Sequence, residues 1–348
     1  MEKTDIKSLT LKELEQVLLE MGEKKFRAKQ IYQWLHQKLA CDFGEMTNLS
    51  SSLREALGER FFLTCLEPVE VRISQIDGTR KYLFGLADGH VIESVWMQYR
   101  HGNSVCISTQ VGCRMGCRFC ASTLDGLERS LTVSEMLDQV YRIQVLTGER
   151  VSHIVLMGSG EPLDNYDAVL KFVHMVSGSG GLNISQRNIT ISTCGIVPGI
   201  RRLAGEKLQI TLALSLHASS DEVRRELMPV ARSYCLEEVL DACREYFAMT
   251  GRRMTFEYSL VKGVNDSPRE AMALAKLLGG HCGHVNLIPV NLVQERGYAQ
   301  PDQAAVRQFQ GILEKQGLTV TVRREMGRDI QGACGQLRKS FLNQREGG

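Results

Sequence analysis

The sequence has no apolar run that approaches the roughly 20 residues a membrane-spanning helix needs. Its amino terminus is charged where a secretory signal would need an apolar stretch. A bulk charge is also missing, because 42 Lys and Arg face 40 Asp and Glu and leave a net charge of +2. We therefore expect a cytoplasmic protein with no membrane partner, in which any contact with a polyanion depends on a local basic patch.

Internal repeats and low-complexity stretches are absent as well. The 43% hydrophobic content can fill a large interior. A chain of this size buries roughly three quarters of its unfolded surface, which excludes intrinsic disorder as a general description. At about 150 residues per domain, the 348 residues predict roughly two domains or one large α/β unit with an accessory piece.

Residues 1–70 are predicted to form a small helical accessory domain. Apolar residues recur at helical spacing over 11–18 and again over 31–39. Between them, Phe26 interrupts a basic run over 24–29 that could contact the phosphate backbone of RNA. A solvated helix face with Phe26 and Trp34 in the core would explain the same residues. Both interpretations stay open on the sequence alone.

Residues 71–98 are predicted to form a β-meander that links two larger parts. Apolar and polar residues alternate over 81–86 and 91–97, as in strands with one buried face. The Asp-Gly pairs at 77–78 and 88–89 are typical of hairpin turns.

Residues 99–340 alternate strand-like apolar runs with helical patterns, which indicates a parallel sheet. Thr132 and Glu135, for example, form a capping box that opens one helix. Six or seven such units favour an α/β fold, as a full or partial barrel or a doubly wound sheet. The strand-like runs cover 104–108, 154–157, 189–192, 210–216, 255–260, 285–289 and 320–323.

The sharpest motif is a C-x3-C-x2-C triad on the loop after the first barrel strand, formed by Cys113, Cys117 and Cys120. Three thiolates within eight residues can hold one metal centre. A closed [4Fe-4S] cluster takes four cysteine ligands, so three would leave one iron open to a small molecule. The alternative is a Cys3His zinc site completed by a histidine such as His101 or His153.

Polar residues also stand where the predicted strands end, which is where a barrel carries its chemistry. Gly160 and Glu161 follow the second strand, so that the backbone could approach a ligand and the carboxylate could accept a hydrogen bond from it. Turn formers and lone histidines are common at such places, and only their joint placement indicates a ligand site. The other strand-end residues are Ser192, Ser215, His217 and Asn291.

The remaining cysteines divide into two groups. Cys334 lies on a glycine-flanked polar loop, and Cys106 lies seven residues before the triad, which makes them candidate reactive thiols. A disulfide framework is not expected in a reducing compartment. The other six are therefore interpreted as small buried hydrophobes, namely Cys41, Cys65, Cys194, Cys235, Cys243 and Cys282.

The triad, with Phe119 directly before its last cysteine, resembles the radical S-adenosylmethionine (SAM) superfamily. From the basic segment at 24–27 to Cys334-Gly-Gln-Leu337, the chain further resembles the RlmN/Cfr family of radical SAM RNA methyltransferases. That resemblance implies a partial (β/α)6 TIM-like barrel with a helical accessory domain over 1–70, a meander linker over 71–98 and the barrel with its catalytic loop over 99–340. One departure is Cys120-Ala-Ser-Thr, where the family often has Cys-Ala-Thr-Gly.

The resemblance also implies roles for single residues. The triad would hold one [4Fe-4S] cluster, Cys334 would carry a methyl group from a first SAM, and a second SAM would supply the radical. Cys106 would be the second catalytic thiol and Glu93 the proton acceptor. The implied contacts to SAM are Gly160, Glu161, Ser192, Ser215, Leu216, His217 and Asn291.

The implied substrates are 23S rRNA at the peptidyl-transferase centre and tRNA next to the anticodon, with an external electron donor such as flavodoxin or ferredoxin. The Gly-Glu-Pro-Leu and Arg-Met-Gly-Cys motifs are more similar to those of the family members that methylate adenine at C2 than to those of the members that methylate C8. C8 methylation, another radical SAM reaction such as sulfur insertion, and a zinc-stabilised RNA-binding protein without catalysis are the alternatives. Basic residues near the carboxyl end, at 323, 324, 328, 338 and 339, fit RNA docking.

Overall fold

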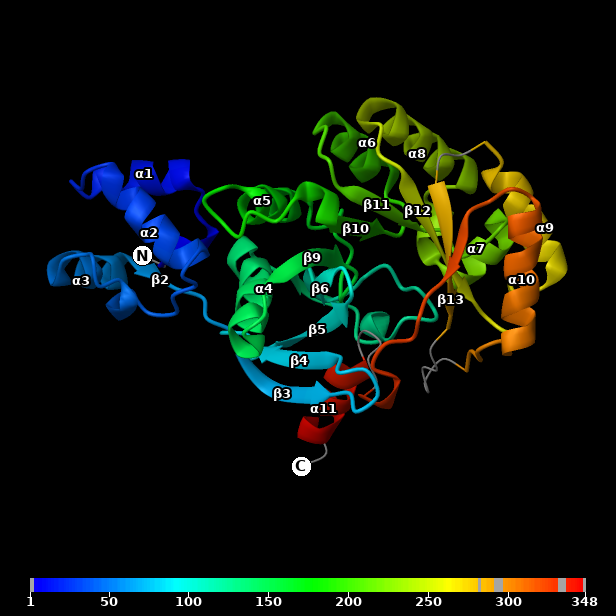
Figure 1. The fold of residues 1–348 in the computed structure, drawn as a ribbon, viewed down its shortest axis with the longest axis horizontal. Coiled ribbons are helices and arrows are strands. Elements are labelled where there is room, and N and C mark those ends of the chain that lie inside the picture. The colour runs from blue at the N-terminus through cyan, green and yellow to red at the C-terminus, as the bar shows by residue number, and fades with distance from the viewer. Residues whose placement is uncertain (1–2, 281–282, 291–296, 331–335, 347–348) are drawn as a thin grey trace.

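The computed structural model describes residues 3–280, 283–290, 297–330 and 336–346. A group of amino-terminal helices lies at one end of the molecule, and a broad curved sheet with flanking helices forms the rest (Figure 1). In the described residues, no helix is both long and apolar enough to cross a membrane.

The amino-terminal unit contains α1 (Leu11–Glu20), α2 (Phe26–His36) and α3 (Ser51–Arg60), flanked by the short parallel strands β1 (Thr4–Asp5) and β2 (Phe61–Phe62). Thr10 and Glu13 form a capping box that starts α1. The predicted helices are confirmed. One interpretation of the basic run placed Phe26 in the core. In the structure its side chain is 51% exposed, and the Arg27 guanidinium lies over its ring.

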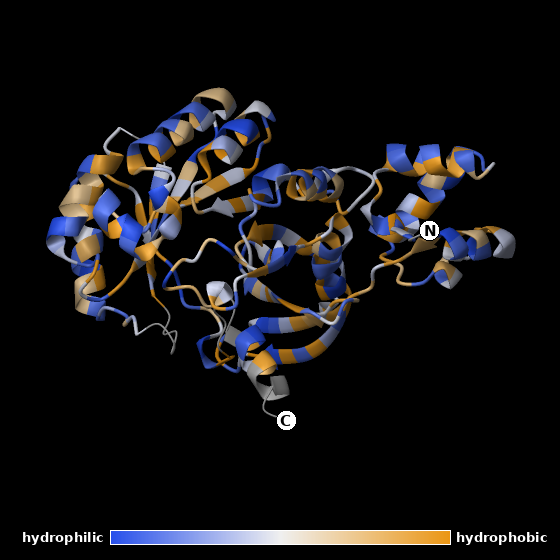
Figure 2. Cartoon of the chain, turned by 180° about the vertical axis from the view of Figure 1, so that it is seen from behind, coloured by the Kyte–Doolittle hydropathy of each residue, from blue (hydrophilic) through white to orange (hydrophobic). Residues whose placement is uncertain are grey.

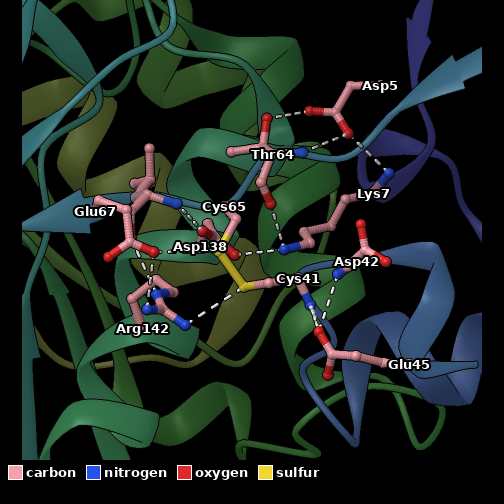
Figure 3. The surroundings of a disulfide bond; sticks show 11 residues. Asp5, Lys7, Cys41, Asp42, Glu45, Thr64, Cys65, Glu67, Asp138 and Arg142 are labelled. Atoms are coloured by element: carbon pink, nitrogen blue, oxygen red, sulfur yellow. Dashed lines mark hydrogen bonds and ion pairs between the residues drawn. A yellow bond between two sulfur atoms is a disulfide. The ribbon is translucent and has the colours of Figure 1, made fainter. Parts of the chain in front are cut away.

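A buried polar network joins this unit to the barrel helix α4 (Val133–Thr147). Lys7 lies against Asp138, with 2.5 Å between Nζ and Oδ1, and its Nζ also donates to the carbonyl of Thr64. The other carboxylate oxygen of Asp138 accepts from the backbone N–H of Leu66 at 2.6 Å. Figure 3 shows these contacts converging from separate segments. The two charges satisfy each other inside the interface, as buried charges must.

The same region corrects the interpretation of two cysteines as unpaired hydrophobes, because Cys41 and Cys65 form a disulfide (Figure 3). Arg142 of α4 donates to Cys41 Sγ at 3.4 Å and to the carbonyl of Leu66 at 3.0 Å. The pairing connects the segment after α2 to the segment that enters the large sheet. Sequence spacing could not reveal it, since the two thiols meet only through the packing of the helical unit.

One ten-stranded sheet organises the rest of the chain, in the order β14-β13-β12-β11-β10-β9-β6-β5-β4-β3. Within this sheet, each pair from β6–β9 to β13–β14 is parallel, whereas β3, β4 and β5 form an antiparallel meander that pairs directly with β6 in antiparallel fashion. The meander therefore continues the barrel sheet. The strands are β3 (Glu67–Ile73), β4 (Arg80–Gly85), β5 (Val91–Tyr99), β6 (Gly102–Cys106), β9 (Val151–Leu156), β10 (Ile189–Thr193), β11 (Thr211–Ser215), β12 (Met254–Leu260), β13 (Gly283–Pro289) and β14 (Val320–Val322).

Helices connect the parallel strands and cover the outer face of the sheet (Figure 1). Figure 2 shows that hydrophobic and hydrophilic residues alternate along these helices, as expected of helices that bury one face. This arrangement confirms the predicted partial α/β barrel. The helices are α4, α5 (Tyr166–Ser177), α6 (Val197–Gly205), α7 (Asp221–Leu227), α8 (Leu236–Thr250), α9 (Pro268–Leu278) and α10 (Gln303–Lys315).

A last helix, α11 (Gln336–Glu346), packs on the meander rather than on the outer face of the parallel strands. Leu337 is fully buried in a small apolar cluster with Leu83 of β4 and Val91 of β5. Upstream, Asp329 holds the β3–β4 turn by accepting from Ser74 Oγ at 2.7 Å and from the N–H of Gln75 at 2.9 Å. The carboxyl-terminal segment thus crosses back to the meander.

Candidate active site

The cysteine triad lies on a loop that a small two-stranded stem closes. β7 (Gln110–Gly112) pairs with β8 (Leu127–Ser130), so the residues between them form a closed loop beside the end of β6. At the base of the stem, the N–H of Cys113 donates to the carbonyl of Gly126 at 2.7 Å. Gly112 has φ +75° and a Cβ there would collide with that carbonyl, so glycine is required at this position.

The three thiols influence one another. Burial, with a smaller contribution from the charge of Cys120, raises the pKa of Cys113 to about 12. Burial also raises the pKa of Cys117, and both other cysteines of the triad add to the rise. Three thiolates gathered in a buried place need a compensating positive charge, which a metal centre would supply.

The donor set fits an iron–sulfur cluster, because three cysteines on one loop supply thiolate ligands for three of its irons. In the described part of the chain, no group of three or more His, Cys, Asp or Glu side chains converges as the ligands of one metal ion. The two histidines considered for zinc, His101 and His153, contact each other edge to face with centroids 5.1 Å apart.

An apolar wall lines the cysteine loop. Phe119 packs on a cluster that includes Leu227, Met228 and Val261. Its ring also meets the edge of His217, with 4.9 Å between centroids. A dry wall of this kind limits the access of water and oxygen to a reactive group.

His217 is a buried neutral imidazole at the end of β11. Burial lowers its pKa to about 3, and the nearby Arg224 adds to the effect. Its Nδ1 accepts from the N–H of Ser259 at 2.9 Å, and its backbone has φ +57°, an uncommon conformation for a residue other than glycine. Its backbone carbonyl also accepts from Asn265 Nδ2 at 2.8 Å, so the turn after β11 is fixed by the segment that follows β12.

Glu161 is fully enclosed by backbone donors. Its carboxylate accepts from the N–H of Cys194 at 2.8 Å and from that of Leu163 at 3.1 Å. Burial raises its pKa, and these hydrogen bonds oppose the rise. Gly160 beside it has φ +104°, and a Cβ there would collide with Gln110. Glu161 therefore ties the ends of β9 and β10 together, whatever ligand contact its remaining lone pairs make.

The other predicted SAM contacts line up along neighbouring strand ends. Ser192 of β10 and Ser215 of β11 have their hydroxyl oxygens 3.4 Å apart. The N–H groups of Leu216 and His217 both donate to the carbonyl of Glu257 on β12. The structure thus brings Ser192, Ser215, Leu216 and His217 to one edge. Asn291 lies outside the described residues.

Sequence reasoning missed Arg224, a fully buried arginine of α7. Its guanidinium donates to the carbonyl of Cys194 at 2.7 Å and to that of Leu216 at 3.3 Å, so it connects the ends of β10 and β11. Its charge also lowers the pKa of Cys117 against the effect of burial. Nothing in the sequence around this residue, within an amphipathic helix rich in charge, distinguishes it from a surface arginine.

Cys106 and Glu93 lie on adjacent strands of one hairpin. Cys106 is paired with Val95 in the β5–β6 ladder, and Glu93 stands two residues before Val95, so both side chains point to the same face of the sheet. Cys106 is 4% exposed and packs with Val95 and Met97. Cys334, the third residue assigned a chemical role, lies outside the described residues, as does Cys282.

Glu93 is 3% exposed and has two strong partners. Its Oε2 lies 3.2 Å from Nζ of Lys81, and its Oε1 accepts from the N–H of Arg338 at 2.6 Å. Lys81 was also missed from the sequence. A lysine in an alternating strand normally faces solvent. The only sequence signal against this was that Lys81 and Leu83, two residues apart in a strand, lie on the same face.

Comparison with known proteins covers both parts of the molecule. The family model of the ribosomal RNA large subunit methyltransferase N-terminal domain matches residues 4–63, and that of the radical SAM superfamily matches residues 107–275. A protein of Lachnospira eligens described as a probable dual-specificity RNA methyltransferase RlmN is 61% identical over 97% of this chain and 97% of its own length. A protein of Alkaliphilus oremlandii with the same description is 56% identical over 98% of this chain and 99% of its own.

A solved structure agrees with this similarity. The crystal structure of a radical SAM methyltransferase from Sphaerobacter thermophilus is 44% identical and superimposes with a TM-score of 0.92. The match covers 96% of this chain and 98% of that one. The similarity therefore extends over the helical unit, the meander and the barrel together.

Proposed function

This chain belongs to the RlmN family of radical SAM RNA methyltransferases, and from that premise we propose that it methylates C2 of adenosine in 23S rRNA and in tRNA. The rRNA target would be at the peptidyl-transferase centre and the tRNA target next to the anticodon. The observation that carries the proposal is the placement of Cys106 and Glu93 on one face of a hairpin beside the stem of the cysteine loop. A thiol and a carboxylate so placed could complete a reaction on one base.

Adenine C2 is an electron-poor aromatic carbon, and it offers no lone pair that could displace a methyl group from a sulfonium. A methyl group must therefore be carried on the protein and activated there. We assign Cys334 as the carrier, because a thiolate displaces a methyl group from SAM readily and releases S-adenosylhomocysteine. A [4Fe-4S] cluster, held by Cys113, Cys117 and Cys120, would when bound supply the electron that cleaves a second SAM, with flavodoxin or ferredoxin as the donor.

The 5′-deoxyadenosyl radical would take a hydrogen atom from the S-methyl group of Cys334, and the resulting methylene radical would add to C2. Glu93 or Cys106 would then accept the proton from C2, and the unpaired electron left on the ring would pass to the oxidised form of the external electron carrier. Cys106 as thiolate would attack the sulfur of Cys334, so that a disulfide forms while the carbon–sulfur bond breaks. The electron pair of that bond stays with carbon, which takes a proton and becomes the methyl group. The strand-end set from Gly160 to His217, with Asn291, would hold SAM.

The target base must leave its stack to reach this face, since C2 is inaccessible inside a helix. The helical unit over 1–70 and the basic carboxyl end over 323–339 are the proposed RNA contacts. Within the domain limits proposed here, the meander over 71–98 connects them to the barrel over 99–340.

Isotope transfer tests the proposal. Enzyme without a methyl group on Cys334 is supplied with SAM that carries a trideuterated methyl group. One deuterium should move to 5′-deoxyadenosine, and the adenine should gain CD2H at C2. An intact CD3 group on the base, with unlabelled deoxyadenosine, would contradict the roles of Cys334 and of the second SAM. Methylation at C8, separated by chromatography against a standard, would favour the alternative specificity.

A further inference from the structure

Lys81 and Glu93 form a buried ion pair. The proposed reaction gives a role to Glu93 but none to Lys81. Their side chains are 0% and 3% exposed, and 3.2 Å separates Nζ from Oε2. Two charges lose their hydration on such burial, and the attraction between them often does no more than offset this loss. A buried pair is therefore weak evidence for stability and calls for a functional explanation.

The second carboxylate oxygen of Glu93 is held from another direction. Oε1 accepts from the N–H of Arg338 at 2.6 Å, and Arg338 is the third residue of α11. The first N–H groups of a helix have no partner within the helix, so Glu93 satisfies one of them and places its negative charge at the positive end of the helix dipole. Lys339 continues this attachment, since its Nζ donates at 2.6 Å to Asp125 within the cysteine loop.

The ion pair with Lys81 and the hydrogen bond from Arg338 together fix the direction of the Glu93 carboxylate. Lys81 lies on β4 directly opposite Val95 of β5, and Val95 in turn lies opposite Cys106 of β6. Side chains opposite one another in a ladder share a face, so Lys81, Glu93 and Cys106 all stand on the same side of the sheet. A free glutamate side chain has several rotamers, whereas one held at both oxygens keeps one orientation relative to Cys106.

We propose that Lys81 is a positioning residue that orients the Glu93 carboxylate for proton acceptance. This inference rests on the proposed function, in which Glu93 is a candidate acceptor of the C2 proton. Lys81 does not touch the base. It holds Oε2 while the start of α11 holds Oε1, and the orientation of the acceptor is set before RNA binds.

The test replaces Lys81 by Met, which keeps the length of the side chain and removes its charge. Because proton removal follows covalent attachment of RNA, the variant should still form the protein–RNA adduct but resolve it slowly. In single-turnover reactions we expect about a tenfold to hundredfold slower release of methylated RNA, the reduction that misplacement of a catalytic group by about 1 Å can cause. Adduct is measured by gel shift before and after nuclease, with iron content and melting temperature to establish folding.

A matched control stands on the same strand. Phe84 lies directly opposite Ile92 in the β4–β5 ladder and is fully buried on the other face of the sheet, so Phe84→Leu disturbs the packing of β4 away from Glu93 and α11. The conservative variant Lys81→Arg should restore most of the release rate, because it keeps the charge. Adduct that accumulates in Lys81→Met but not in Phe84→Leu supports the inference. Equal accumulation in both variants, or release at the wild-type rate in Lys81→Met, overturns it.

A third variant separates this inference from the function on which it rests. Glu93→Gln should accumulate at least as much adduct as Lys81→Met. If Glu93→Gln releases methylated RNA at the wild-type rate, the proposed role of Glu93 fails. If Glu93→Gln is slow and Lys81→Met is not, the proposed function stands and only the positioning role is rejected. If Lys81→Met does not fold, Lys81→Gln is assayed in its place against the same criteria.

Discussion

At the scale of single residues, burial controls the protonation of two histidines. His36 of α2 is fully buried against α4, with Nδ1 3.0 Å from the hydroxyl of Tyr141. Burial lowers its pKa to about 3, and the charge of Lys7 adds to the effect. An unfolded histidine takes a proton near pH 6.5, so the unfolded state binds more protons than the folded state between about pH 6.5 and 3. Stability is therefore fully present above pH 6.5 and falls as the pH decreases toward 3.

We predict that His36→Asn weakens this acid sensitivity. Asparagine can keep a hydrogen bond to Tyr141 without taking up a proton. Between pH 7.5 and pH 5, the wild type should lose about 2 kcal/mol more unfolding free energy than the variant. Denaturant unfolding at both pH values measures the difference. Parallel losses in the two proteins would show that His36 is not the responsible group, since His217, also lowered to about 3, remains in both.

A second prediction at this scale concerns Cys106. Because its proposed step follows attachment of the RNA, Cys106→Ala should leave protein covalently joined to RNA. Nuclease digestion and peptide mass spectrometry should find a nucleotide on the peptide that contains Cys334. Cys243→Ala, which removes another buried thiol on α8, is the control and should give free, methylated RNA. Free and fully active Cys106→Ala would remove this residue from the mechanism.

At the scale of elements, the sequence predicts the parallel strands well and their long-range anchors poorly. All seven predicted barrel strands overlap the observed ones, because each is a short apolar run between amphipathic helices. The Asp-Gly turns of the meander are equally local signals and are confirmed. The capping of α11 by Glu93 joins residues 245 positions apart, and no periodicity reveals such a contact. The Cys41–Cys65 disulfide was missed because the two thiols meet only in the folded chain. In addition, no disulfide was expected in a reducing compartment.

We predict that this disulfide stabilises the amino-terminal unit. It closes a loop over a sequence separation of 24 residues, and the decrease of loop entropy in the unfolded chain corresponds to about 3 kcal/mol. Cys41→Ala should therefore lower the unfolding free energy and increase proteolytic cleavage within residues 1–65. Cys235→Ser, which removes a partly exposed thiol and keeps a side chain that can cap α8, serves as the control. If native wild-type protein is alkylated at both Cys41 and Cys65 without a reductant, the pair is not bonded in solution and the prediction fails.

At the scale of the whole molecule, the net charge is only +2, so binding of RNA depends on local groups of basic residues at the contact surface. Lys24, Lys25 and Lys29 are exposed at the start of α2, far from the helices α9 and α10 at the other end of the sheet (Figure 1). We predict that replacing Lys24, Lys25 and Lys29 together by Gln weakens tRNA binding and lowers its salt dependence. Each phosphate that the variant no longer neutralises should reduce the slope of log K against log salt by about 0.7 to 0.9.

Filter binding at several salt concentrations measures this slope. Replacing the exposed Lys276 of α9 and Lys315 of α10 by Gln alters net charge at the opposite end and should leave the slope unchanged. An equal change in the two variants would indicate a diffuse charge effect and count against a contact by the helical unit.

The tight connection between β5 and β6 restricts which insertions and deletions this hairpin can accept. Tyr99 pairs with Gly102, so only Arg100 and His101 lie in the turn, and a Cβ at residue 102 would collide with Ser152. Side chains alternate along both strands, so one inserted residue between Glu93 and the turn would send the carboxylate to the opposite face from Cys106. Two inserted residues would restore the face and only lengthen the hairpin. Descendants of this sequence can thus change the length of either strand in steps of two, while single-residue insertions or deletions separate the base from its thiol.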